Sequence, residues 1–250
     1  MLSGKVALIT GGGQGVGQGI ALALAAKDAD VVVTGRTLSK CEATADMLRE
    51  RGVRSLGLEC NVKSKDDLEA VLNRTVSEFG RLDILVNNAQ EVSRGPLLKM
   101  SDDDLTSNWE SGPLATFRLM TTAHPYLKDS QGHIINLVSS VMKRWDVGTY
   151  GVYAAVKAAT QQLTRAAANE WGPDGIRVNC IMPHAKSPAL KWWIENNPEE
   201  AAAFQASIPL RRVGECEDDI GAFVALMCSD EAGYLTGQTI ALDGGQAFTG

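Results

Sequence analysis

A glycine-rich segment between an apolar run and a helical segment constrains the fold of this chain more than any other feature. Residues 10–17 read TGGGQGVG; the apolar run spans residues 6–10, and a segment of helical period begins near Val16. Glycines let backbone amides approach a pyrophosphate at the positive end of a helix, where a Cβ would keep the phosphate away. A tight turn that binds nothing is the alternative, but the flanking strand and helix favour a dinucleotide site.

The alternation of apolar runs and helical segments continues along the chain. Further runs typical of buried strands lie at residues 31–33, 55–58, 82–86, 133–138, 177–181 and 239–242. This pattern predicts an α/β protein with a three-layer, doubly wound Rossmann fold and a parallel sheet of about seven strands. Because no linker divides the chain, we expect residues 1–250 to form a single domain with a substrate lid at about 183–209.

Overall composition narrows the classes of partner. The net charge is -6 and the basic residues are scattered, which disfavours nucleic acid as a partner. The sequence contains no stretch of about 20 apolar residues that would predict a membrane span. The start of the chain has no apolar signal region, so we expect a cytoplasmic protein. The five cysteines form no zinc pattern with the three histidines, which predicts reduced thiols and no metal site.

The end of the second strand bears on the choice of dinucleotide. Gly35 stands where an NAD enzyme usually has an acidic residue for the ribose 2′-hydroxyl, and Arg36 follows directly. A guanidinium suits a 2′-phosphate in both charge and geometry, so NADP(H) is favoured over NAD(H). A solvated surface arginine is the alternative.

Tyr153 and Lys157 form a candidate proton-transfer pair. They are four residues apart on a predicted helix over residues 152–168, so they share one face. The lysine ammonium and an oxidised nicotinamide would both favour the phenolate of Tyr153. Ser140, which ends the fifth strand, is expected to donate a hydrogen bond to the substrate oxygen while Tyr153 exchanges the proton.

Together these motifs resemble those of the short-chain dehydrogenase/reductase family over nearly the whole chain. The family's nucleotide motif is matched by Thr10, Gly11, Gly15 and Gly17, its N-N-A-G by Asn87, Asn88 and Ala89, and its Y-x-x-x-K by Tyr153 and Lys157. The position of Ser140 also agrees. The resemblance implies reversible interconversion of an alcohol and a carbonyl on a small-molecule substrate, and a homo-oligomer, either a tetramer or a dimer.

The resemblance also implies cofactor contacts along the same edge of the sheet. Lys157 would bind the nicotinamide ribose, Asn88 would lie on the adenosine ribose side, and Pro183 with its successor would bracket the nicotinamide. The expected cofactor-binding residues are Gly11, Gly13, Gln14, Gly15, Val16, Gly17, Arg36, Asn61, Val62, Asn88, Ala89, Tyr153, Lys157, Pro183 and His184.

Four positions depart from the family pattern. Gly112 occupies the place of the family's catalytic asparagine, and Gln90 that of the glycine in N-N-A-G. Asn61 replaces an acid that usually contacts adenine, and His184 replaces a glycine beside the nicotinamide. Glycine can also bend a helix and expose a carbonyl, so the proton relay can survive without the asparagine side chain.

The expected substrate pocket is apolar and aromatic, which favours a hydrophobic or cyclic substrate. Packing of these side chains on the core is the alternative. Two other functions stay open. Tyr150, seven residues before Lys157, resembles the tyrosine of the enoyl reductase branch, which reduces activated C=C bonds; a cofactor-binding sensor with weakened catalysis would explain Gly112, Gln90 and His184. The pocket candidates are Gln90, Met142, Trp145, Tyr150, Trp192 and Trp193.

Overall fold

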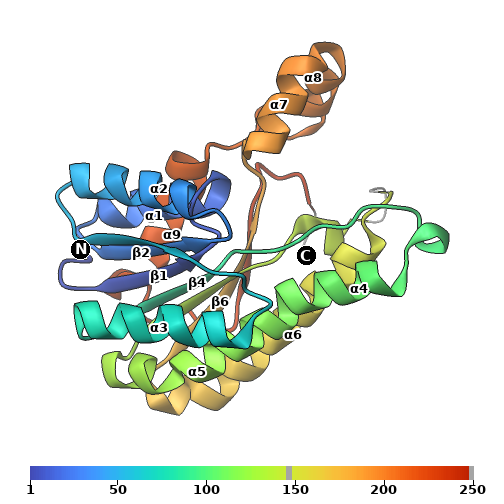
Figure 1. Ribbon diagram of the computed structural model, residues 1–250. Coiled ribbons are helices and arrows are strands. Elements are labelled where there is room, and N and C mark those ends of the chain that lie inside the picture. Colours follow the sequence, from blue (N-terminus) through green and yellow to red (C-terminus); the bar gives the residue numbers. More distant parts are fainter. Residues whose placement is uncertain (145–147, 248–250) are drawn as a thin grey trace.

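The structure, a computed structural model, describes residues 1–144 and 148–247 and contains one parallel sheet (Figure 1). The strands lie in the order β3-β2-β1-β4-β5-β6-β7, so the predicted doubly wound sheet of seven strands is confirmed. The strands are β1 Val6–Thr10, β2 Asp30–Gly35, β3 Ser55–Glu59, β4 Ile84–Asn87, β5 His133–Leu137, β6 Arg177–Pro183 and β7 Thr239–Leu242.

Helices cover both faces of the sheet, which gives the three predicted layers (Figure 1). One face carries α1 Gly15–Ala25, α2 Leu38–Glu50 and α9 Ala222–Met227. The opposite face carries α3 Lys65–Phe79, α5 Ala115–Ser130 and α6 Gly151–Trp171. Short 3-10 turns lie at Leu97–Lys99, Ser140–Met142, Gly172–Asp174 and Asp230–Ala232.

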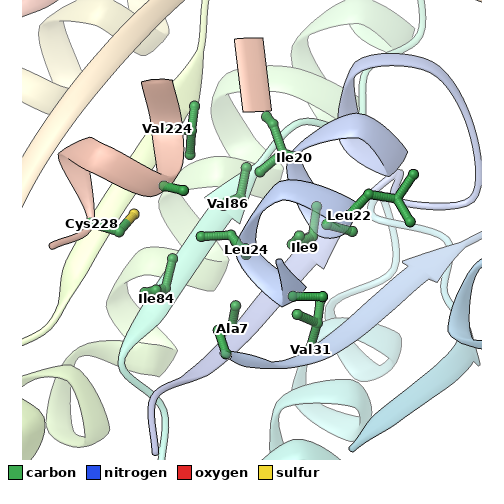
Figure 2. Close-up of a cluster of buried hydrophobic side chains, with 14 of the residues drawn as sticks. Ala7, Ile9, Ile20, Leu22, Leu24, Val31, Ile84, Val86, Val224 and Cys228 are labelled. Atoms are coloured by element: carbon green, nitrogen blue, oxygen red, sulfur yellow. The ribbon is translucent and has the colours of Figure 1, made fainter. Parts of the chain in front are cut away.

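The strand period of two divides the core between these faces. On β1, Ala7 and Ile9 point into the cluster beneath α1, α2 and α9, whereas Leu8 points into the cluster beneath α3, α5 and α6. Figure 2 shows the first cluster, in which Ile20 and Leu24 of α1 pack over β1 and β4. All five residues of β1 are buried, as expected for a central parallel strand.

The chain reverses its direction of travel across the sheet between β1 and β4. Strands β2 and β3 lie on one side of β1, and β4 to β7 lie on the other. In open parallel sheets, ligands bind outside the carboxyl ends of the strands at this reversal. The loops that follow β1 and β4 therefore mark the expected binding edge.

Two further regions depart from the regular alternation. Helix α4, Asp102–Trp109, begins with a capping box at Ser101 and continues into a π-helical segment, η2, at Glu110–Leu114 before α5 starts. A second π-helical segment, η5, spans Cys216–Gly221 and leads into α9. The sequence patterns predicted neither segment.

The stretch predicted as a lid, residues 183–209, contains two helices after the end of β6. Helix α7 spans Pro188–Asn196 and α8 spans Pro198–Ser207, and the pair projects from the sheet (Figure 1). That this pair closes over a substrate stays a prediction. Across the described residues, no helix has the length and apolar character needed to cross a bilayer.

Close packing of α1 against η5 gives a stability prediction. A Cβ added to Gly19 would overlap the Cys216 carbonyl and lie 2.7 Å from its Cβ. We therefore expect Gly19→Ala to lower the free energy of unfolding by about 1–3 kcal/mol in urea titrations. Gly172 has open space around it, so Gly172→Ala should leave stability unchanged or raise it by up to about 1 kcal/mol. Equal stability of the two variants would contradict the packing argument.

Candidate active site

A cavity of about 480 Å³ lies at the expected binding edge. The loops after β1, β2 and β4 form most of its wall. Ten of the expected cofactor-binding residues line it: Gly11, Gly13, Gln14, Gly15, Val16, Arg36, Asn61, Val62, Asn88 and Ala89. Gly17, Tyr153, Lys157, Pro183 and His184 lie outside this lining, as do all expected pocket residues in the described ranges except Gln90.

Hydrogen bonds between Thr10 and the β4 loop hold the two walls of this cleft together. The Asn88 side-chain amide donates to the carbonyls of Thr10 at 2.9 Å and Gly11 at 3.0 Å. In return, the Thr10 hydroxyl accepts from the backbone amides of Asn88 at 3.0 Å and Ala89 at 3.1 Å. Asn88 is therefore a support of the glycine loop.

Glycine at position 17 lets the start of α1 lie against the loop that follows β4. A Cβ on Gly17 would lie 2.5 Å from the Asn88 amide nitrogen and 2.5 Å from the Gly11 carbonyl oxygen. Such contacts would force the loop and Asn88 apart. The cavity is lined by Gly13, Gln14, Gly15 and Val16 where α1 begins, and a helix N-terminus with adjacent glycines fits the pyrophosphate of a dinucleotide.

Charged side chains cross the cleft beyond the second strand. Arg36 pairs with Glu91 at 2.5 Å and is 66% exposed, while Lys63 binds the other carboxylate oxygen of Glu91 at 2.9 Å. Hydrogen bonds from Ser107 and Lys63, with the charges of Lys63 and Arg36, lower the pKa of the Glu91 carboxyl. Glu91 thus holds the guanidinium that was predicted to bind a 2′-phosphate.

Sequence reasoning missed several residues that line the cleft. Lys40 lies four residues after Arg36, and its Nζ donates to the Gln14 side chain at 2.8 Å. A second basic residue close after Arg36, at the start of the helix that follows β2, was a signal that could have identified it. The other missed lining residues are Gly35, Thr37, Cys41, Cys60, Glu91, Ser111, Ser187 and Pro188.

Lys157 is buried beneath the edge of the sheet, with 4% of its surface exposed. Its Nζ donates to the Leu137 carbonyl at 2.7 Å and lies 5.5 Å from the centre of the Tyr153 ring. Burial lowers the pKa of Lys157 to about 8. The lysine is thus fixed beside the tyrosine and can change its charge near neutral pH.

Burial and a serine hydroxyl shift the pKa of Tyr153 in opposite directions. Burial raises the pKa to about 12, although a hydrogen bond with the Ser139 hydroxyl acts in the opposite direction. The expected phenolate depends on an oxidised nicotinamide as well as on Lys157, and it stays a prediction. The hydroxyl beside Tyr153 is that of Ser139, whereas Ser140 is buried at the start of the next 3-10 turn. A catalytic role for Ser140 stays a prediction.

A chain of buried amides and hydroxyls ties α6 to the sheet. Asn87 on β4 donates to Asn136 on β5 at 2.8 Å, and Asn136 donates to Thr164 on α6 at 2.8 Å. Thr164 lies seven residues after Lys157, on the same face of the helix. These bonds fix the position of α6 along the sheet and hence the position of Lys157.

The expected substrate residues form no single lining in this structure. Met142 packs on the small buried cluster of Val138, Cys180 and Met182, as the core alternative predicts. Tyr150 lies 6.1 Å from Tyr153 between ring centres, and Trp145 lies outside the described residues.

Aromatic rings of α7 and α8 pack on each other and on His184. The rings of His184 and Trp193 pack edge to face against the ring of Phe204 on α8, with distances between ring centres of 5.4 Å and 5.8 Å. Trp192 is 64% exposed. Burial lowers the pKa of His184, so its imidazole is neutral at neutral pH.

Comparisons with known proteins agree with this geometry. The family model described as enoyl-(acyl carrier protein) reductase matches residues 11–247. The chain is 37% identical over 253 residues to a 12alpha-hydroxysteroid dehydrogenase from a Clostridium species, covering 98% of this chain and 97% of that protein. It is 35% identical over 243 residues to a 3-oxoacyl-(acyl-carrier-protein) reductase of Staphylococcus aureus, covering 96% and 97%.

A solved structure gives the same result. The structure of a 7 alpha-hydroxysteroid dehydrogenase complexed with NADH and 7-oxo glycochenodeoxycholic acid matches with a TM-score of 0.92 and 31% identity, covering 98% of this chain and 95% of that one. Fold, cleft and relatives therefore agree: the chain belongs to the short-chain dehydrogenase/reductase family, whose NAD(P)(H)-dependent oxidoreductases act on alcohols and carbonyls.

Proposed function

We propose that this protein interconverts an alcohol with a ketone or aldehyde on a hydrophobic, ring-bearing substrate and uses NADP(H). The observation that carries the proposal is the pair of Tyr153 and buried Lys157 on one face of α6, at the sheet edge that holds the glycine-lined cleft. A phenol and an ammonium at this separation can move one proton and stabilise the charge left behind.

In this proposal the residues of the chain manage the proton, and the nicotinamide, when bound, supplies or accepts the hydride. Tyr153 donates its phenolic proton to the carbonyl oxygen during reduction. Lys157 stabilises the phenolate that forms, and Ser140 or Ser139 holds the substrate oxygen by a hydrogen bond. The raised pKa of Tyr153 suits this direction, because the acid stays protonated at neutral pH.

The substrate class rests on the lid and on the relatives. Trp192 and Trp193 on α7 and Phe204 on α8 give the projecting helices an aromatic character suited to a flat, apolar ring system. Two relatives are named for hydroxysteroids, so a cyclic secondary alcohol of that kind leads the proposal. Reduction of a 3-oxoacyl group, or of an activated C=C bond, is the second candidate, supported by the family model and by Tyr150 beside Tyr153.

We also propose that the enzyme acts in the cytoplasm as a homo-oligomer. All five cysteines are unpaired thiols, as is usual in a reducing compartment. Leu105 and Trp109 on α4 and Phe117 on α5 are each about half exposed. Large apolar side chains exposed on neighbouring helices support a surface that binds another protein chain.

Tyr153→Phe tests the proposed proton transfer. Removing the hydroxyl should reduce turnover of hydroxysteroids and cyclic ketones by about 10²–10⁴-fold, because no other group supplies the proton. Binding of NADPH, measured by fluorescence, should be unchanged. Tyr150→Phe is the matched control and should retain activity. If Tyr150→Phe alone abolished turnover, and the substrates consumed were activated alkenes, the enoyl-type reaction would replace the proposal.

The lowered pKa of Lys157 predicts a pH dependence. Its ammonium is present below about pH 8 and is lost above it, whereas Tyr153, with a pKa of about 12, keeps its proton over the same range. We expect kcat/KM for carbonyl reduction to be level up to about pH 8 and to fall above it. Lys157→Arg retains the charge, so any residual activity should lack this break. A rate that rises from pH 8 to 9 would exclude the assignment.

Arg36→Ala tests the choice of dinucleotide. Loss of a charge-assisted contact with the 2′-phosphate should weaken NADPH binding by about tenfold or more and leave NADH binding within about threefold. Glu91→Gln should have the opposite effect, because it releases Arg36 and Lys63 from their carboxylate partner. Equal losses for NADPH and NADH in Arg36→Ala would show that this arginine does not select the cofactor.

A further inference from the structure

The Gln90 side chain occupies the space that a side chain on residue 112 would need. A Cβ built on Gly112 would lie 3.0 Å from both Cδ and Nε2 of Gln90, and closer still to Oε1. Oε1 is buried and lacks a hydrogen-bond partner among the described residues, so the group of residue 112 that faces it is a Cα hydrogen. While Gln90 keeps this position, residue 112 has room for glycine alone.

The Gln90 side chain links the loop after β4 to the π-helical segment η2, Glu110–Leu114, which is called the bulge below. The bulged helix is α4 together with this segment. Its Nε2 donates to the carbonyls of Asn108 at 2.9 Å and Glu91 at 2.9 Å, and to the Ser111 hydroxyl at 3.2 Å. Because two of these partners are carbonyl oxygens, the NH₂ group must face them. The same Ser111 hydroxyl accepts from the backbone amide of Glu91 at 3.1 Å, so two adjacent residues of the loop hold this turn.

The contact lies where helix α4 passes into the π-helical segment η2. Pro113 lies inside η2 and has no N–H to donate to a preceding carbonyl. The Gln90 amide donates to the carbonyl of Asn108, near the end of α4, and so adds a hydrogen bond from outside the helix at this junction.

This link lies directly beside the proposed proton-transfer pair. The π-helical segment η2 and helix α4 both pack against α6, which carries Tyr153 and Lys157. Gln90 and Ser111 also line the dinucleotide cleft. A shift of the bulge would therefore alter the surface on which α6 rests and the wall of the cleft together.

We propose that Gln90 is a positioning residue: its side chain fills the space left by Gly112 and holds the bulged turn against α6, so that the two residues act as one compensating pair. The inference rests on the proposed function for its effect on turnover. Gln90 would affect turnover indirectly: its amide contacts the bulge, and the bulge contacts α6. An amide on residue 112 could restore the same contact only if the one on residue 90 were removed.

A double-mutant cycle tests this pairing in the full-length protein. The variants are Gln90→Gly, Gly112→Asn and the combination of both, with Gly172→Asn as a control at a site with open space. Each single change should lower kcat by about tenfold to a hundredfold, because small displacements near reacting groups have effects of this size. The combination should recover at least about tenfold over Gly112→Asn.

Two readouts separate positioning from general destabilisation. The pH profile of kcat/KM is expected to break near pH 8, where Lys157 loses its proton. This pH should shift in Gln90→Gly and return to its original value in the combination. Gln90→Glu lacks the NH₂ donor and should show the same shift as Gln90→Gly. Thermal unfolding should show the same coupling, with the combination melting at least about 3 °C above the sum of the single effects. Additive effects on both kcat and melting temperature would overturn the pairing. Lack of turnover in the unmodified protein would contradict the proposed function instead, and the melting data would still test the pair.

Discussion

The binding edge of this protein depends on the hydrogen bonds between the Asn88 side chain and the carbonyls of Thr10 and Gly11. These bonds join the ends of β1 and β4, the two strands between which the chain reverses across the sheet. They also require a glycine at position 17, because a Cβ there would displace the amide. The loop that Asn88 anchors leads within three residues to Gln90 and Glu91, which contact the bulged helix and Arg36. One amide therefore sets the geometry of both walls of the cleft.

The fold could be predicted from the sequence because strand and helix periods differ and parallel strands place their carboxyl ends at one edge. Boundaries were less accurate: the helix that carries Tyr153 was predicted over residues 152–168 and spans Gly151–Trp171. The bulge at Glu110–Leu114 could not be predicted, since Pro113 indicates an interruption but not its type. Pairings across loops, such as Arg36 with Glu91, depend on the paths of two distant segments and leave no local pattern.

The residues of the candidate active site could be predicted from the sequence, but the pKa values of their side chains could not. The spacing of Tyr153 and Lys157 on one helix face is fixed by the helical period. Their pKa values depend on burial by α4, the bulge and the sheet, which no local spacing reveals. Burial acts on the two groups in opposite directions, lowering the pKa of Lys157 and raising that of Tyr153. Both shifts favour the neutral forms of the two side chains.

The relation between Gln90 and Gly112 also changes the weight of the alternative functions. Taken from the sequence, Gly112, Gln90 and His184 count as three separate departures and favour a cofactor-binding sensor. In the structure, the Gln90 side chain occupies the space beside Gly112, and the His184 ring packs on Phe204 of α8. A lost side chain alone would leave a void or a mobile turn, but here the volume is filled and the helix carbonyl has its donor. A filled volume and a hydrogen-bonded carbonyl count against treating Gly112 and Gln90 as two separate losses, and so they weaken the support for the sensor.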